Sequence, residues 1–255
     1  MKTALVHLAT RETPEATLEA ALGWLEQAHA QGAELALLPE LFSSGYRYPD
    51  AAQTPEVLAR LQDFARDSGM TVACGVLEAA GERHANRLRV LAPEGERAVY
   101  TKLHLIPAFD EPRTMVPGER PVALELGGFT AGLSICFDLR FPELYRGYAV
   151  QGADLFLVPS AWPAERAAAW ELLARARAAE NQAYLLAVNH AEPPFGAPSL
   201  AVGPLGEVLG RLEAEGLLVV ELDPALPKRL RQQFPVLSER RRDLYGDLFA
   251  QPVSK

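Results

Sequence analysis

The chain has 255 residues, of which 49% are hydrophobic and 23% charged, a composition typical of a globular domain. A net charge of −8 argues against a nucleic-acid-binding surface, and no apolar run approaches the roughly 18 residues of a membrane span. The first ten residues turn polar at Thr10 without the features of a signal peptide. We therefore expect one domain over 1–255, cytoplasmic, with neither nucleic acid nor membrane as a partner.

Apolar strands alternate with amphipathic helices in the first half of the chain. The predicted elements are a strand at 2–8, a helix at 14–30, a strand at 33–40, a helix with Thr54 as N-cap that stops at Gly69, and three strands within 71–106. The three consecutive strands have short turns between them, so we expect part of the sheet to be antiparallel.

The second half continues the alternation. Its predicted elements are a strand at 130–136, a helix at 142–151, a strand at 153–160, a helix at 164–181, a strand at 183–189, and a final pair of strands at 199–203 and 216–222 around the turn 204–206. This order predicts a layered α/β fold.

Three polar side chains each stand at the end of an apolar strand. Glu40 follows ALLP, Lys102 follows AVYT and Cys136 follows GLSI. Because loops at the carboxyl ends of strands build ligand sites in α/β proteins, these residues can meet although they lie far apart in sequence.

Cys136 stands where a strand turns into a helix opened by Pro142. An exposed thiol near a helix N-terminus favours the thiolate, which predicts a nucleophile; the alternative is a buried structural cysteine. Cys74 lies between apolar neighbours inside a strand, which favours a core position. A disulfide between the two is disfavoured because the chain has no C-x-x-C motif.

A nucleophilic cysteine needs a base and a group that stabilises the oxyanion. Glu40 suits the base if its site is desolvated, and His190, at a strand end, is the rival. Lys102 and the backbone N–H of Phe137 would then hold the oxyanion. Alternatively, Glu40 caps a turn and Lys102 protects an edge strand.

Three motifs decide between the catalytic and the structural interpretations of these residues. They are LLPELF (37–42), YTKLHL (100–105) and GLSICFDLRFPEL (132–144). The chain resembles the nitrilase superfamily of carbon–nitrogen hydrolases, with further similarity at 161–184 and 231–245. The resemblance implies a four-layer α-β-β-α sandwich, a catalytic Glu40–Lys102–Cys136 triad, no metal or organic cofactor, and a homodimer. It also places the family's second glutamate on Glu111, for which an exposed acidic pair with Asp110 is the alternative.

Within the superfamily the chain is most similar to the ω-amidases, which cleave the terminal amide of 2-oxo acids such as 2-oxoglutaramate. N-carbamoyl amine and deaminated glutathione amidohydrolases are alternatives, as is a binding protein with an idle thiol. The Pro-rich segment 190–204 departs from the family pattern, and the sequence offers three cations for a substrate carboxylate, namely Arg47, Arg113 and Arg166. We expect 231–255 to be a tail involved in subunit contacts.

Overall fold

Two six-stranded sheets form the centre of the protein, seen here in a computed structural model that describes residues 1–244. The strands are β1 (Lys2–His7), β2 (Leu35–Leu37), β3 (Thr71–Ala80), β4 (Arg83–Ala92), β5 (Gly95–Thr101), β6 (Ala123–Leu126), β7 (Phe129–Leu133), β8 (Leu155–Pro159), β9 (Tyr184–Val188), β10 (Ser199–Val202), β11 (Val208–Leu212) and β12 (Gly216–Glu221). The first sheet has the order β12-β1-β2-β3-β4-β5 and the second the order β11-β10-β9-β8-β7-β6.

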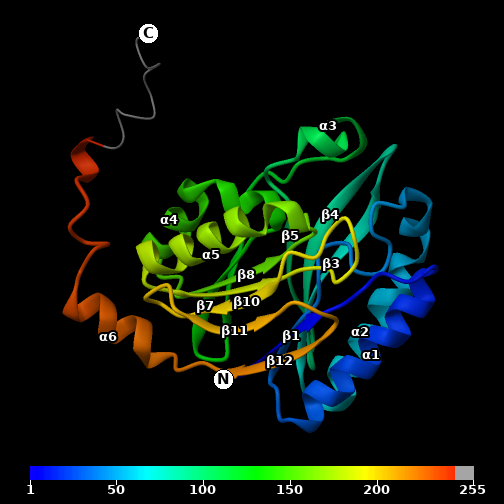
Figure 1. Ribbon diagram of the computed structural model, residues 1–255, viewed down its shortest axis with the longest axis horizontal. Coiled ribbons are helices and arrows are strands. Elements are labelled where there is room, and N and C mark those ends of the chain that lie inside the picture. Colours follow the sequence, from blue (N-terminus) through cyan, green and yellow to red (C-terminus); the bar gives the residue numbers. More distant parts are fainter. Residues whose placement is uncertain (245–255) are drawn as a thin grey trace.

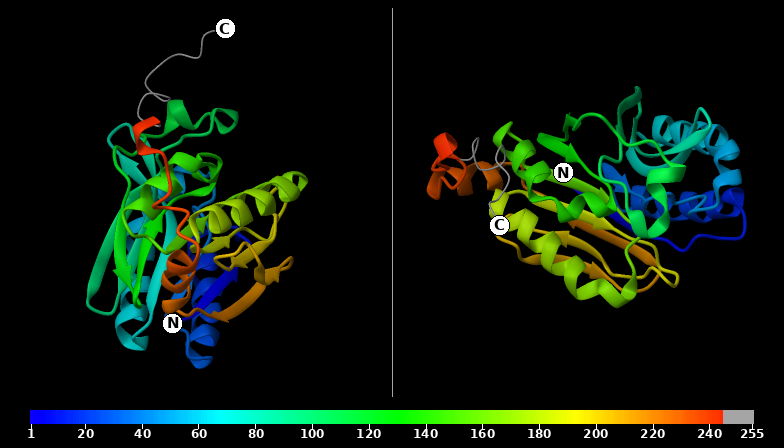
Figure 2. Two further views of the ribbon diagram at one scale, coloured as in Figure 1. Left: turned by 90° about the vertical axis from the view of Figure 1, so that its left-hand side faces the viewer. Right: turned by 90° about the horizontal axis from the view of Figure 1, so that it is seen from above.

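Helices cover the outer faces of both sheets. The α-helices are α1 (Pro14–Ala30), α2 (Thr54–Ser68), α3 (Glu111–Thr114), α4 (Pro142–Val150), α5 (Ala167–Asn181) and α6 (Ala225–Gln233), and the 3₁₀ helices are η1 (Tyr48–Gln53), η2 (Pro107–Phe109), η3 (Cys136–Arg140) and η4 (Ala164–Arg166). α1 and α2 cover the first sheet, and α4 and α5 the second (Figures 1 and 2). The predicted four-layer sandwich is confirmed. Within residues 1–244, no helix has the length and apolarity to cross a membrane.

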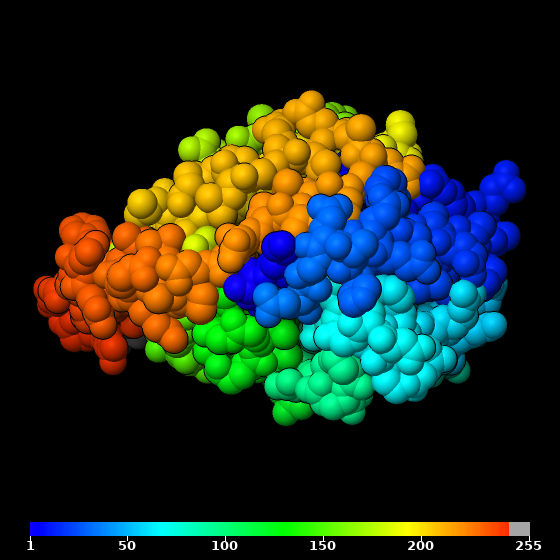
Figure 3. Space-filling view, turned by 90° about the horizontal axis from the view of Figure 1, so that it is seen from below, coloured from blue at the N-terminus to red at the C-terminus, as the bar shows by residue number. Residues whose placement is uncertain are grey.

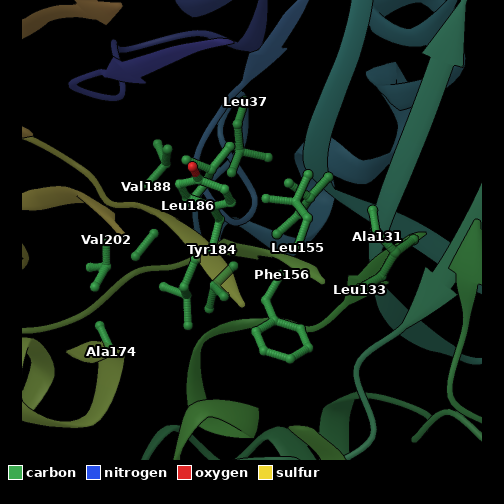
Figure 4. Packing of buried hydrophobic residues seen from close by; sticks show 14 of the residues in the cluster. Leu37, Ala131, Leu133, Leu155, Phe156, Ala174, Tyr184, Leu186, Val188 and Val202 are labelled. Atoms are coloured by element: carbon green, nitrogen blue, oxygen red, sulfur yellow. The ribbon is translucent and has the colours of Figure 1, made fainter. Parts of the chain in front are cut away.

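The inner faces of the two sheets share one apolar core. Leu37 of the first sheet and Leu133 and Leu155 of the second are fully buried in the same cluster (Figure 4). On the outer side of the second sheet, Phe156 meets Tyr145 of α4 edge-on, with ring centroids 5.1 Å apart. Full burial of each such side chain stabilises the fold by about 1.5–3 kcal/mol, so the sheets are held firmly against each other.

Strand direction brings distant parts of the chain to one edge of the sandwich. β2 runs parallel to β3, and β3, β4 and β5 follow as an antiparallel meander. β4 runs opposite to β3, and β5 runs opposite to β4, so β5 has the same direction as β3 and β2. β2 and β5 therefore end at the same edge. In the second sheet β7, β8 and β9 are parallel, so their carboxyl ends also lie together.

The predicted final pair of strands is wrong. β10 pairs with β11, which was not predicted, and β12 instead pairs antiparallel with β1 in the other sheet, with Lys2 opposite Glu221. Figure 3 shows the segment of β12 lying against the N-terminal residues. Either sheet satisfies the apolar pattern of β12, so the pattern alone cannot assign the strand. β6 and α6 were also not predicted.

The predicted cap of α2 is wrong as well. Thr54 is the first residue of the helix, and its hydroxyl donates to the carbonyl oxygen of Leu77 in β3 at 2.5 Å. Because the Thr54 hydroxyl is hydrogen-bonded to the sheet, it does not cap the N-terminal N–H groups of the helix. Thr54 therefore fixes α2 to β3.

The segment after β12 is anchored before it leaves the body. Arg231 in α6 donates to the carbonyl oxygens of Ala153 at 2.6 Å and Asn181 at 2.9 Å, and Gln182 donates to that of Phe234 at 2.9 Å. Residues 245–255 of the predicted tail lie outside the described part of the chain. Its role in subunit contacts stays a prediction.

Gly75 in β3 lies against the segment that follows β2. A Cβ atom at this position would lie 2.5 Å from the Cα of Glu40 and 2.7 Å from the carbonyl oxygen of Pro39. We expect Gly75→Ala to lower the free energy of unfolding by about 1–3 kcal/mol, the usual cost of an overpacked core. Urea denaturation measures the change.

Gly23→Ala is the matched control, because nothing lies within 4 Å of a Cβ at Gly23 in α1. This substitution should raise the free energy of unfolding by about 0.5–1 kcal/mol, because alanine has a higher helix propensity than glycine. Equal effects of the two substitutions would contradict the close approach at Gly75.

Candidate active site

Glu40, Lys102 and Cys136 come together where β2, β5 and β7 end. Glu40 lies in the loop after β2, Lys102 directly follows β5, and Cys136 opens η3 after β7. Glu40 and Lys102 are 0% exposed and Cys136 is 5% exposed. Three segments far apart in sequence thus build one buried polar site.

The ammonium of Lys102 lies between two carboxylates. Its Nζ donates to Oε1 of Glu40 and to Oε1 of Glu111, each at 2.8 Å. Burial by itself would lower the pKa of Lys102, but Glu40, Cys136 and Glu111 outweigh it and raise that pKa. Lys102 therefore keeps a positive charge inside the protein. A buried charge without opposite charges beside it would be strongly destabilising.

The Glu40 carboxylate is held on both oxygens. Asn86 donates its side-chain N–H to Oε1 at 2.6 Å, beside the Lys102 contact, and the backbone N–H of Ala161 donates to Oε2 at 2.8 Å. These donors fix the side chain in one orientation next to Cys136. An oriented carboxylate beside a thiol is the arrangement of a general base.

The backbone around Glu40 is equally fixed. Leu41 has a φ of 49°, and Gly75 exchanges hydrogen bonds with the chain on both sides of it, since its N–H donates to Pro39 at 3.1 Å and its carbonyl accepts from Phe42 at 2.9 Å. This explains why glycine stands at position 75, where a side chain would displace Glu40.

Cys136 differs from its prediction as an exposed thiolate. The residue adopts a φ of 46° at the start of a 3₁₀ turn and is buried. Burial and the nearby Glu40 carboxylate raise the pKa of the Cys136 thiol, against the opposing effects of Lys102 and the Ala161 N–H. The resting group is a protonated thiol, so its proton must pass to a base during attack.

Glu111 belongs to the site, and the alternative of an exposed acidic pair is wrong. It is 0% exposed, and besides Lys102 its donors are the Ile106 N–H at 2.7 Å and the Tyr46 hydroxyl at 3.1 Å. Burial raises the pKa of Glu111 while Lys102 opposes the rise. Burial and the neighbouring carboxylates also raise the pKa of Tyr46, which keeps its hydroxyl a donor.

The rival base and the second thiol point elsewhere. His190 is buried behind Glu40, where Nε2 donates to the Glu40 carbonyl oxygen at 2.6 Å and the Thr10 hydroxyl lies 3.1 Å from Nδ1. Both ring nitrogens are thus engaged away from Cys136. Cys74 is free and buried in β3, and burial raises its pKa to about 12, so it is a core residue as predicted.

A pocket of about 640 Å³ leads to Cys136. Its lining residues are Ile106, Ala108, Phe109, Cys136, Phe137, Arg140, Ala161, Trp162, Pro163, Glu165, Arg166 and Pro194. Of the three predicted cations only Arg166 is among them, beside Glu165 at 3.4 Å. Arg140, which was not selected, also lines the pocket, with its guanidinium carbon 4.7 Å from the centre of the Trp162 ring.

Sequence reasoning missed the residues that orient the predicted ones. Asn86 and the Ala161 N–H hold Glu40, Tyr46 holds Glu111, and Asp138 lies two positions after Cys136 with its side chain fully buried. Among these, only Asp138 carried a usable signal, because it is an acidic residue inside the cysteine motif. The others act through contacts that only the fold creates.

The state of the Cys136 thiol predicts how it reacts. Because its pKa is raised, alkylation of Cys136 by iodoacetamide should become faster as the pH rises from 7 to 9, since only the thiolate attacks. Cys74 should react much more slowly in the native protein, because it lies in the core while Cys136 lines the pocket. Mass spectrometry of timed samples measures both rates, with Cys74→Ala and Cys136→Ala as controls. A Cys136 rate that is already constant above pH 6 would show a preformed thiolate instead.

Comparison with known proteins agrees with this geometry. Residues 2–232 match the carbon-nitrogen hydrolase family model. Omega-amidase NIT2 of Bos taurus is 33% identical, covering 95% of both chains, and 2-oxoglutaramate amidase of Paenarthrobacter nicotinovorans is 34% identical, covering 84% of this chain and 80% of its own.

A solved amidase from Nesterenkonia sp. AN1 superposes with a TM-score of 0.86 at 32% identity, covering 97% of this chain and 99% of its own. That structure, a glutamate-to-glutamine mutant, carries acrylamide added to the active-site cysteine. The predicted family and enzyme class are confirmed: the chain belongs to the carbon–nitrogen hydrolase family.

Proposed function

We propose that this enzyme is an ω-amidase, which releases ammonia from the terminal amide of a small 2-oxo acid such as 2-oxoglutaramate. The observation that carries the proposal is the buried contact of Lys102 with Glu40 and Glu111 beside Cys136, at a pocket with two arginines in its wall. The two relatives named omega-amidase and 2-oxoglutaramate amidase support the substrate class.

In the first half of the reaction, Cys136 forms a thioester. Its sulfur attacks the amide carbonyl while Glu40 takes the thiol proton, and the C–N bond breaks as Glu40 returns that proton to the leaving ammonia. Lys102 and the backbone N–H of Phe137 stabilise the oxyanion of the tetrahedral intermediate. Loss of one such donor typically slows a reaction by on the order of 10²–10³.

In the second half, water hydrolyses the thioester. Glu40 takes a proton from the water as its oxygen attacks the acyl carbon, and the C–S bond breaks to release the acid. The proton then returns to the sulfur, which restores the thiol and the carboxylate. Glu111 does not exchange protons in this scheme and keeps Lys102 charged and in place.

Arg140 is our choice for the substrate carboxylate. It lies four residues after Cys136 and opens into the same pocket, and among residues 1–244 no carboxylate forms an ion pair with it within 4 Å. Arg166, in contrast, has Glu165 beside it at 3.4 Å. A guanidinium that lies over the Trp162 ring and that is paired with no carboxylate within residues 1–244 is well suited to bind a carboxylate from the ligand.

We also propose a cytoplasmic homodimer. Phe234, at the end of α6, is 71% exposed, and Val150, at the end of α4, is 42% exposed, and such apolar side chains favour a protein contact. The mass of the full chain in solution tests dimerisation, and fractionation of cells that make the protein tests its location.

A substrate panel tests the activity. We expect 2-oxoglutaramate to be hydrolysed with the highest kcat/KM, followed by simple amides, because the pocket offers a cation for its carboxylate. Enzymatic measurement of ammonia gives the rates. Carbon dioxide released in equal amount would identify a carbamoyl substrate, and preference for a deaminated peptide would favour the glutathione alternative.

The panel is repeated with Cys136→Ala and Glu40→Gln, which should each lose at least 10³-fold in kcat with the fold retained. Cys74→Ala is the matched control and should keep its turnover. Absence of turnover in the wild-type protein on every substrate would favour the idle-thiol alternative.

Arg140→Met should raise KM for 2-oxoglutaramate by about 10–100-fold, the effect of losing a hydrogen-bonded ion pair. KM for a neutral amide such as propionamide should change less than about threefold, because that substrate has no carboxylate. Arg166→Met is the control and should affect both substrates little. Equal losses on the charged and neutral amides would mean that Arg140 acts through its packing on Trp162.

A further inference from the structure

The carboxylate of Asp138 is buried next to the nucleophile and accepts four hydrogen bonds. Oδ1 accepts from the backbone N–H of His104 at 3.0 Å and from its ring Nδ1 at 2.7 Å. Oδ2 accepts from the Tyr100 hydroxyl at 2.6 Å and from the backbone N–H of Ile135 at 2.9 Å. Asp138 itself is 0% exposed. None of these contacts is part of the proton transfers described above.

These four donors come from the two segments that carry the reacting groups. Tyr100 and His104 stand on either side of Lys102 in the chain, whereas Ile135 directly precedes Cys136. One carboxylate therefore joins the end of β5, in the first sheet, to the turn after β7, in the second. The ring of His104 also stacks on Phe141 at a centroid distance of 3.6 Å, which fixes the same junction from its solvent side.

The turn at Cys136 needs such support because its backbone is strained. A non-glycine residue with a φ of 46° is unfavourable by itself and persists only where its surroundings hold it. Asp138 closes the turn in both directions, since its N–H donates to the Ile135 carbonyl at 2.9 Å and its carboxylate accepts from the Ile135 N–H. The Asp138 side chain and the strained Cys136 thus lie in one hydrogen-bonded turn.

We propose that Asp138 is a positioning residue, which holds the Cys136 sulfur in a fixed position relative to the Lys102 ammonium. The inference rests on the proposed roles of Cys136 and Lys102. It explains why these groups, supplied by different sheets, meet in one geometry. Asp138 touches neither substrate nor the reacting atoms.

The geometry requires a carboxylate at this position. Each oxygen faces one backbone N–H, that of His104 or that of Ile135, and a backbone N–H can only donate. An asparagine would have to turn its own NH₂ group toward one of them in either orientation. Asp138→Asn thus breaks the junction without changing the size of the side chain.

The test compares Asp138→Asn with the wild type on an amide that the wild type hydrolyses. We expect kcat to fall by on the order of 10²-fold, the effect of a misplacement of about 1 Å, with KM changed less than about threefold. Alkylation of Cys136 by iodoacetamide depends on Lys102 only through the pKa of the thiol, so its rate should fall much less than kcat. A kcat within threefold of the wild type overturns the proposal, and so does a parallel fall in kcat and alkylation, which would mean local unfolding of the turn.

Asp154→Asn is the matched control for the loss of a buried carboxylate. Asp154 is 2% exposed and accepts from the Thr130 N–H at 2.9 Å, at the start of β7 rather than after its end. It should leave kcat unchanged, because the amide oxygen can still accept from the Thr130 N–H. If it reduces kcat as much as Asp138→Asn does, the effect is general destabilisation and the proposal is wrong.

Two further variants keep the test decisive if Asp138→Asn does not fold. Tyr100→Phe and His104→Ala each remove one side-chain donor and keep both backbone contacts of the carboxylate, so each should lower kcat by about three- to tenfold with KM unchanged. Unchanged kcat in both would overturn the proposal. Failure of the ω-amidase assignment is visible separately, in the wild-type panel, before any variant is compared.

Discussion

The buried ammonium of Lys102 is the constraint on which the rest of the site depends. A charge removed from water is tolerated only where opposite charges and hydrogen bonds replace its hydration. Glu40 and Glu111 provide them at 2.8 Å each, and neither carboxylate is exposed. The three groups must therefore be delivered together, which requires that the loops after β2 and β5 and the short helix α3 converge. The sandwich supplies the rigid edges at which they do.

Each charged group in turn fixes a further part of the chain. Glu40 binds the Ala161 N–H, which follows β8 in the second sheet, so the carboxylate joins the two sheets at their common edge. Asp138 joins them a second time, through Tyr100 and Ile135. Cys136 stands between these two junctions, and this explains how a residue with strained backbone can hold a defined position. The polar contacts of Glu40 and Asp138 are thus also the contacts that align the sheets.

Sequence patterns predicted the parts of this structure that depend on local order. Apolar strands ending at Glu40, Lys102 and Cys136 indicated that these residues can meet at one edge, because strand direction determines where loops lie, and the motifs around them selected the triad. The sequence left open whether Cys136 is buried, since Glu40 and Ala161, which interact with its thiol, are distant in sequence. The same limit applies to β12, whose apolar pattern fits either sheet and which only the tertiary fold assigns.

The presence of two carboxylates on one lysine has a reason in the balance of charge. In the proposed mechanism, the thiol proton neutralises the negative charge of Glu40 as Cys136 attacks, and a new negative charge appears on the substrate oxygen. Lys102 thus exchanges one anionic neighbour for another, and the total charge of the buried site stays constant. In the same scheme Glu111, to which Ile106 and Tyr46 also donate, exchanges no proton and keeps Lys102 charged and in place. With Glu40 alone, the partly formed oxyanion would be the main counter-ion of Lys102 during the attack, and in a buried environment this weaker pairing would raise the barrier.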